Sequence, residues 1–251
     1  MPSVADLTGL HELLLVVPVV IFVGYFVFGI TGFGASPITI PVLVHLLPLT
    51  FVLALAALLD LGSALALGFH TRQHADTREL ATLVPFTLLG LALGVTLLLR
   101  LPRDATLLAL GLFVCTYAVN LMLRRETRRG LSRWWAAPAG IAGGLVGALF
   151  GMGGPPYVMY LAGRITEPNA QRATISQMVI LNVGLRVVAF ALAGLLVSRT
   201  LWLAVAGLLP VAWAGVWLGH RVHLRLAPAT AARIIAAALF MAGAALIART
   251  L

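Results

Sequence analysis

Two glycine-rich stretches interrupt apolar runs of this sequence, and their residue types are suited to binding an anion. Residues 32–37 read Gly-Phe-Gly-Ala-Ser-Pro, and residues 151–156 read Gly-Met-Gly-Gly-Pro-Pro. Glycines release the backbone from a helix, and a proline fits the first turn of a helix that begins again. The N-terminus of that helix offers unpaired N–H groups and the positive end of the helix dipole, which attract anions without a charged side chain. Close packing of helices on glycines is the alternative interpretation. The predicted anion-binding residues of the two stretches are Gly32, Gly34, Ala35, Ser36, Gly151, Gly153 and Gly154.

Asp60, Asn182 and Arg186 lie inside apolar segments, where inserting an ionisable side chain costs about 2.5–3.5 kcal/mol. Asp60 is expected either to couple anion movement to a gradient, by carrying a proton or a cation, or to accept a structural hydrogen bond from a neighbouring helix. Arg186 follows Asn182 by four residues, which places both side chains on one helical face. Its guanidinium can hold two oxygens of an anion, or it can form an ion pair with Asp60 that joins the two halves of the chain. The two roles are compatible, because an anion can compete with Asp60 for the guanidinium.

The elements that carry these residues are predicted to be membrane helices. Of the 251 residues, 61% are hydrophobic and 10% are charged, and the mean hydropathy is +1.04, which excludes an ordinary soluble domain. Apolar runs of about 20 residues without strand-like alternation indicate helices, because a helix satisfies its own backbone in lipid. We therefore expect an all-α, polytopic membrane bundle. The 17 basic residues are all arginines that lie mostly between the apolar runs, so they indicate orientation in the membrane rather than nucleic-acid binding. The single cysteine and the scattered histidines predict no metal site and no other cofactor.

Three landmarks recur in the same order in both halves of the chain, which predicts an internal duplication. The glycine-rich stretches are the first. The second pairs residues 60–62 (Asp-Leu-Gly) with residues 182–184 (Asn-Val-Gly). The third is a PxxxxGxxxG run at residues 85–94 that returns at 210–219, each followed by Arg-Leu. We expect a first transmembrane repeat at 1–123, a basic cytoplasmic linker at 124–135 and a second transmembrane repeat at 136–251.

The number of membrane crossings depends on how the glycine-rich segments are threaded. If each apolar segment crosses once, there are roughly eight spans, and the arginines divide poorly between the two sides. If each glycine-rich segment dips in and returns, roughly three full spans per repeat remain and the linker side holds most of the arginines. The repeats are then inverted, which is the arrangement that supports alternating access. We favour this second arrangement, with the linker in the cytoplasm, and the number of full spans stays open between roughly six and eight.

The glycine-rich motif in each half, the PxxxxGxxxG run followed by Arg-Leu, and the basic linker together resemble the TauE/SafE family of membrane proteins, also called sulfite exporters. The resemblance extends over residues 24–248. It implies two duplicated membrane modules and transport of small sulfur-containing anions, such as sulfite, sulfoacetate or other sulfonates, and thiosulfate. Export is implied by the family name alone. Ser36 in the first motif stands where the second has a proline, so its hydroxyl is a further candidate donor to the ligand.

The expected function is therefore that of a multi-pass secondary transporter in the cytoplasmic (inner) membrane, and not of an enzyme. The expected partners are the small sulfur-containing anion and the lipid bilayer. A proton as coupling ion and a homodimer remain open, and no nucleic-acid partner is expected. A transporter of another small organic anion is the alternative. An intramembrane enzyme is a further alternative, but it would need a nucleophile with a base or a metal set, and the sequence offers little beside Asp60.

Overall fold

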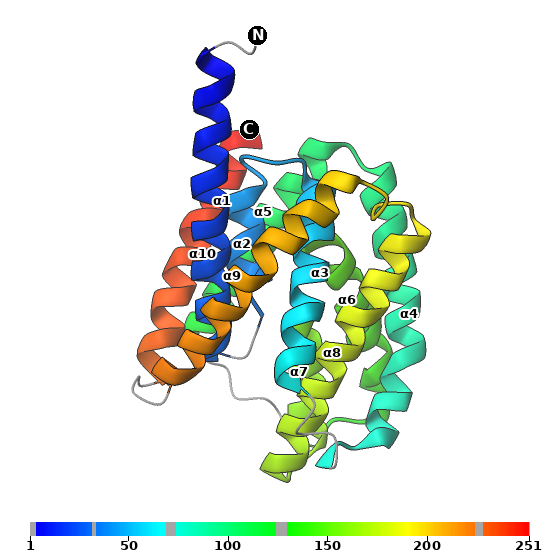
Figure 1. The fold of residues 1–251 in the computed structure, drawn as a ribbon. Coiled ribbons are helices and arrows are strands. Elements are labelled where there is room, and N and C mark those ends of the chain that lie inside the picture. Colours follow the sequence, from blue (N-terminus) through cyan, green and yellow to red (C-terminus); the bar gives the residue numbers. More distant parts are fainter. Residues whose placement is uncertain (1–3, 32–33, 69–73, 124–129, 224–227, 251) are drawn as a thin grey trace.

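The computed structural model of the protein describes residues 4–31, 34–68, 74–123, 130–223 and 228–250, and within these ranges it is built of α-helices joined by loops (Figure 1). The first half contains α1 (Val4–Thr31), α2 (Ser36–Leu43), α3 (Leu49–Gly68), α4 (Thr77–Arg100) and α5 (Arg103–Leu123). The second half begins with the short 3-10 helix η2 (Arg133–Trp135) and continues with α6 (Ala136–Phe150), α7 (Gly154–Arg164), α8 (Pro168–Leu192), α9 (Arg199–His223) and α10 (Pro228–Thr250). The described ranges contain no strand. The prediction of an all-α membrane bundle is confirmed.

Several helices have the length and composition of membrane spans. Among the described residues, three helices are long and apolar enough to cross a bilayer, Thr77–Arg100, Pro168–Leu192 and Arg199–Arg221. Shorter apolar helices cover Leu15–Ile30, Leu49–Leu65 and Leu239–Ala248. Large apolar side chains also lie on the outer surface of the bundle, where Leu192 is 85% exposed and Leu203 is 64% exposed. Such a surface is suited to lipid chains rather than to water.

Both glycine-rich stretches end one helix and begin another, as expected. In the first half α1 ends at Thr31 and α2 begins at Ser36, with a proline in its first turn. In the second half α6 ends at Phe150, and Gly151 follows it with a φ of 70°. This left-handed conformation favours glycine at the end of a helix. The N–H of Gly151 donates to the carbonyl of Gly147, and α7 then begins with a proline in its first turn.

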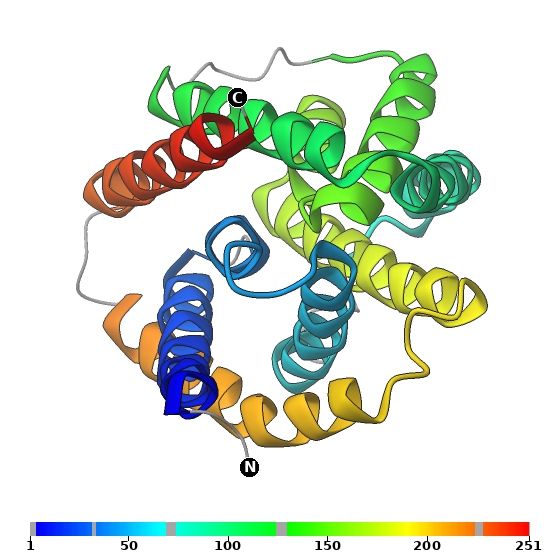
Figure 2. The ribbon, with the colours of Figure 1, turned by 90° about the horizontal axis from the view of Figure 1, so that it is seen from above.

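The chain reverses direction at each break, so that α2 runs back beside α1 and α7 runs back beside α6 (Figure 1). The following helices of the two halves run in opposite directions: α3, α4 and α5 are antiparallel to α8, α9 and α10 respectively (Figure 1). Seen from above, α2 lies inside the bundle, enclosed mainly by α1, α3 and α10 (Figure 2). This is the arrangement that inverted repeats would give, and the duplication itself stays a prediction.

The largest helix contacts connect the two halves, and glycines make them possible. The pairs are α4 with α6, α1 with α9, and α5 with α10. A Cβ on Gly90 of α4 would collide with the backbone carbonyl of Ile141 in α6, and a Cβ on Gly219 of α9 would collide with that of Phe26 in α1. The PxxxxGxxxG runs therefore let the helix backbones approach closely, as small residues do in membrane proteins. Close packing explains these glycines, and it also applies to part of the second break, because a Cβ on Gly153 would collide with the backbone carbonyl of Gly143 and a Cβ on Gly151 with the side chain of Ile40.

Candidate functional site

A buried ion pair joins the two halves of the chain at the centre of the bundle. The Nη2 atom of Arg186, on α8, lies 2.9 Å from Oδ2 of Asp60, on α3. The side chains are 1% and 9% exposed. The sequence left two roles open for Arg186, anion binding and an ion pair with Asp60. The structure contains the ion pair.

Two hydroxyl groups complete the surroundings of the Asp60 carboxylate. The hydroxyl of Tyr25, on α1, donates to Oδ1 at 2.8 Å, and the hydroxyl of Ser36, at the start of α2, donates to Oδ2 at 2.7 Å. On the other side, Nη1 of Arg186 donates to the carbonyl oxygen of Gly147, on α6, at 3.3 Å. Each group therefore comes from a different helix, and the network depends on the tertiary fold.

This network has no net charge, but it contains more hydrogen-bond donors than hydrogen-bond acceptors. Asp60 and Arg186 cancel each other, and the carboxylate accepts hydrogen bonds from three donors. The Nε atom of Arg186 is buried and has no hydrogen-bond partner among the residues that the structure describes. A buried ion pair recovers its desolvation cost only when the remaining hydrogen-bonding groups are satisfied. The unpaired Nε leaves the guanidinium able to donate a hydrogen bond to a further oxygen atom.

A small cavity lies beside the ion pair, between the two glycine breaks. Its volume is about 50 Å³, and a water molecule needs about 10–15 Å³ of such free space. A Cβ added to Gly34 or to Gly154 would meet no atom within 4 Å, so both glycines border open space. The lining comes from both halves: Phe28, Gly34, Ser36, Pro37, Asp60, Ala64, Tyr117, Gly151, Met152, Gly153, Gly154, Pro155, Val179, Asn182 and Val183.

Two helices, α2 and α7, begin at this cavity. The N-terminus of each contributes the positive end of its dipole, equivalent to about half an elementary charge in a long helix. Prolines reduce the number of N–H donors, because Pro37 in α2 and Pro155 and Pro156 in α7 have no N–H. The helix ends therefore favour an anion through their dipoles and through few backbone donors, and side chains must supply the rest.

Asn182 provides a polar group on the opposite wall of the cavity. Its Nδ2 donates to the hydroxyl of Tyr157, on α7, at 2.9 Å, and both side chains are buried. Tyr157 itself packs against Gly143 of α6, where a Cβ would overlap the tyrosine ring. The amide is thus fixed in place by its neighbours, which orients it at the cavity wall.

The structure gathers most of the residues that the sequence singled out. Seven of them line the cavity, namely Gly34, Ser36, Asp60, Gly151, Gly153, Gly154 and Asn182. Arg186 is not part of the lining, although a Cβ on the lining residue Gly151 would come within 3.1 Å of its Nη1 atom. Ala35 is fully buried and is also outside the lining. Gly32 lies outside the described residues. The roles of these residues in binding stay predictions.

Sequence reasoning missed Tyr117, which lines the cavity, and two tyrosines that are hydrogen-bonded to residues of the lining, Tyr25 and Tyr157. Each lies in an otherwise apolar segment, and a tyrosine in such a place needs a partner for its hydroxyl. That requirement is a usable signal, but the identity of the partner depends on which helices meet. Among the described residues, no group of three His, Cys, Asp or Glu side chains is placed to hold a metal ion.

Comparison with known proteins agrees with this architecture. A curated relative, the probable inner membrane transporter protein TsaS of Comamonas testosteroni, is 25% identical over 192 residues, which cover 75% of this chain and 80% of the relative. No solved structure matches the chain. The family model described as sulfite exporter TauE/SafE matches residues 16–246, which is nearly the whole sequence. The chain therefore belongs to the TauE/SafE family and is a membrane transporter of the inner membrane.

Proposed function

We propose that the chain transports a small sulfur-containing oxyanion, such as sulfite, a sulfonate or thiosulfate, and that the anion binds in the cavity between the two glycine breaks. The observation that carries this proposal is the position of the Asp60 carboxylate. It is itself an oxyanion, it borders the cavity, and it is held by one guanidinium and two hydroxyls. The family description and the name of the relative support transport, and the family name supports a sulfur oxyanion.

The same geometry supports coupling of the anion to a proton. An anion that takes the place of the Asp60 carboxylate on Arg186 would leave two negative charges in one buried site, unless Asp60 binds a proton. Binding of one anion is then linked to uptake of one proton, and a monovalent anion would move without net charge. The two halves of the bundle, which meet at the Asp60–Arg186 pair, would open the site alternately to either side of the membrane.

The first test is thermal stabilisation of the detergent-purified protein by sulfite, thiosulfate, sulfoacetate, taurine, isethionate, sulfate, acetate and chloride. An anion present at 100 times its Kd stabilises the native state by about 2.7 kcal/mol. For a chain of this size, that raises the Tm by about 5–11 °C. A selective shift with sulfur oxyanions supports the proposal. Equal shifts with acetate and chloride, or no shift at millimolar concentrations, contradict it.

The second test measures proton coupling through the pH dependence of binding. If a proton binds together with the anion, the affinity falls by up to tenfold for each unit that the pH rises. Asp60→Asn, which is neutral like a protonated aspartate, should bind the anion with little dependence on pH and should not transport it against a gradient in liposomes. If this variant folds only in the presence of the anion, that result also supports competition for Arg186. A wild-type affinity that does not change with pH contradicts proton coupling.

A further inference from the structure

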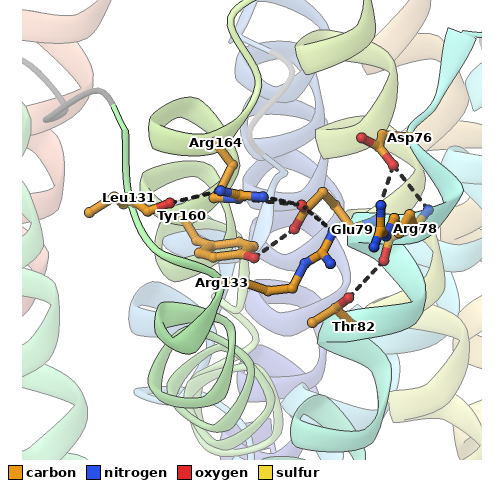
Figure 3. Close-up of polar contacts among 8 residues, drawn as sticks. All are labelled: Asp76, Arg78, Glu79, Thr82, Leu131, Arg133, Tyr160 and Arg164. Atoms are coloured by element: carbon orange, nitrogen blue, oxygen red, sulfur yellow. Dashed lines mark hydrogen bonds and ion pairs between the residues drawn. The ribbon is translucent and has the colours of Figure 1, made fainter.

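A second buried carboxylate, Glu79, lies outside the lining of the central cavity and is held by two arginines and a tyrosine (Figure 3). Its Oε1 atom is 2.8 Å from Nη2 of Arg164 and 3.2 Å from Nη2 of Arg133. The hydroxyl of Tyr160 donates to Oε2 at 2.6 Å. The Glu79 side chain is 4% exposed, whereas those of Arg164 and Arg133 are 28% and 38% exposed. We call these four residues the Glu79 cluster.

The Glu79 cluster connects three separate elements. Glu79 is in the first turn of α4, Tyr160 and Arg164 are at the end of α7, and Arg133 begins η2, at the end of the linker. The segment before η2 is also attached to the end of α7, because the N–H groups of residues 130 and 131 both donate to the carbonyl of Gly163. The Nη1 atom of Arg164 donates to the carbonyl of Leu131 at 3.0 Å (Figure 3). The outer end of α7 is therefore tied to α4 and to the end of the linker.

The inner end of the same helix forms a wall of the central cavity. Gly154 and Pro155, at the start of α7, line the cavity. The 11 residues of α7 span about 15 Å, at about 1.5 Å per residue. A helix this short moves as a rigid rod, so a displacement of its outer end at the Glu79 cluster shifts the wall of the cavity as well.

Among the described residues, the end of α2 in the first half carries no acid and no arginine that could form such a cluster. After α2, residues 44–47 read Val-His-Leu-Leu, without an acid or an arginine, and α2 packs mainly on α1, α3 and α10. The Glu79 cluster is thus a feature of one side of the molecule, the side that carries the linker. Its arginines are partly exposed to solvent, so separating them from Glu79 leaves charges that water can reach. The Asp60–Arg186 pair lacks this access.

We propose that Glu79, Arg133 and Arg164 form the gate of the central cavity on the linker side of the membrane, and that the gate is closed in this structure. It opens when the arginines release Glu79 and the outer end of α7 moves away from α4. The link to α4 passes through side chains of the cluster and through an apolar core that holds Leu83 of α4 and Leu161 of α7, while the α7 backbone packs on α6 and α8. The proposal rests on the transport function proposed above, because a gate has a role only if the cavity receives a substrate.

The test follows the accessibility of the cavity and needs no substrate. The native cysteine is removed by Cys115→Ser, and Gly154→Cys places a thiol in the cavity wall, where an added Cβ meets no atom within 4 Å. The rate of modification by a membrane-impermeant trimethylammonium methanethiosulfonate is measured in vesicles of both orientations. In this background, Glu79→Gln and Arg164→Gln should raise the rate from the linker side at least tenfold. They should leave the rate from the opposite side equal or lower.

Glu167→Gln serves as the matched control. Glu167 is an exposed carboxylate that caps the start of α8 by accepting hydrogen bonds from the N–H groups of Asn169 and Ala170, so its loss removes a charge without touching the gate. Tyr160→Phe provides a milder change that keeps every charge, and it should raise the linker-side rate by a smaller factor. This variant decides the test if Glu79→Gln does not fold.

Three results would overturn the gate: an unchanged linker-side rate in the variants that fold, an equal increase from both sides, or the same increase with Glu167→Gln. An equal increase from both sides would mean that the substitution only loosens the packing. The labelling and binding experiments together distinguish failure of the gate proposal from failure of the proposed transport function. If anions bind but the labelling rates do not change, the gate is wrong and transport stands. If the substitutions raise the labelling rate from the linker side alone while no anion binds, the gate proposal is supported and the proposed substrate class is wrong.

Discussion

Adding one methyl group at Gly154 should weaken binding of the anion without destabilising the fold. Gly154 is the first residue of α7 and lines the cavity, and a Cβ there would meet no atom within 4 Å. A methyl group is about as large as a water molecule and would fill about a quarter of the 50 Å³ cavity. Overfilling a packed site costs about 1–3 kcal/mol. The affinity for the anion should therefore fall by about 5-fold to 150-fold in Gly154→Ala.

The stability of Gly154→Ala should be unchanged or slightly higher. An alanine in place of a glycine with an allowed helical backbone stabilises a protein by about 0.4–1 kcal/mol, because it restricts the unfolded chain. The Tm without ligand should thus stay equal or rise by up to about 4 °C. Calorimetric titration with sulfite gives the affinity, and a thermal scan gives the Tm.

The matched control is Gly207→Ala in α9. Gly207 also borders open space, but it lies on a different, apolar pocket, so this variant should bind the anion as the wild type does. If Gly154→Ala binds sulfite with unchanged affinity and unchanged Tm, the cavity is not the substrate site. If both variants lose affinity equally, the loss does not come from the cavity.

Three further substitutions test the packing and the ion pair. Arg186→Ala should lower the free energy of unfolding by about 3–5 kcal/mol, because it leaves the Asp60 carboxylate buried without its counter-charge. The double variant with Asp60→Ala should lose less than the sum of the two single variants in chemical denaturation, and additive losses would show that the pair is not coupled. Gly90→Ala should lower stability by about 1–3 kcal/mol, because its Cβ collides with the carbonyl of Ile141; an unchanged Tm would refute the close approach of α4 and α6. Asp76→Ala should cost about 0.5–2 kcal/mol and speed amide exchange in the first turn of α4, because the carboxylate caps that helix, whereas Asp76→Asn should retain most of the cap.

The fold class follows from local properties of the sequence. Apolar runs in lipid must satisfy their own backbone groups, so helices are required wherever the runs occur. The helix breaks could be placed from the glycines and prolines at residues 32–37 and 151–156, because their backbone preferences are local. The structure shows α2 and α7 beginning at Ser36 and Gly154. The PxxxxGxxxG runs were recognised from the sequence as landmarks of a duplication, but their part in helix packing required knowledge of the helix that each one faces.

The sequence predicted most residues of the candidate site, but it did not predict which of them contact each other. Asp60, Asn182 and Arg186 were conspicuous because polar side chains are costly in an apolar segment. The sequence left open whether Arg186 faces a ligand or Asp60, and the structure shows the ion pair, with Arg186 outside the lining of the cavity. Tyr25 gave only a weak signal, because an isolated tyrosine reveals its role through the partner of its hydroxyl.

The sequence by itself determined that this protein is a helical membrane protein, where its helices break, and that Asp60 and Arg186 lie inside apolar helices, because hydropathy and backbone preferences act within a few residues. Only the tertiary structure decided that Asp60 meets Arg186 across the two halves, that Tyr25 and Ser36 join them, and that Glu79 ties the end of α7 to α4. The physical reason is distance along the chain. Asp60 and Arg186 are 126 residues apart, and a contact of that separation depends on how every helix between them packs.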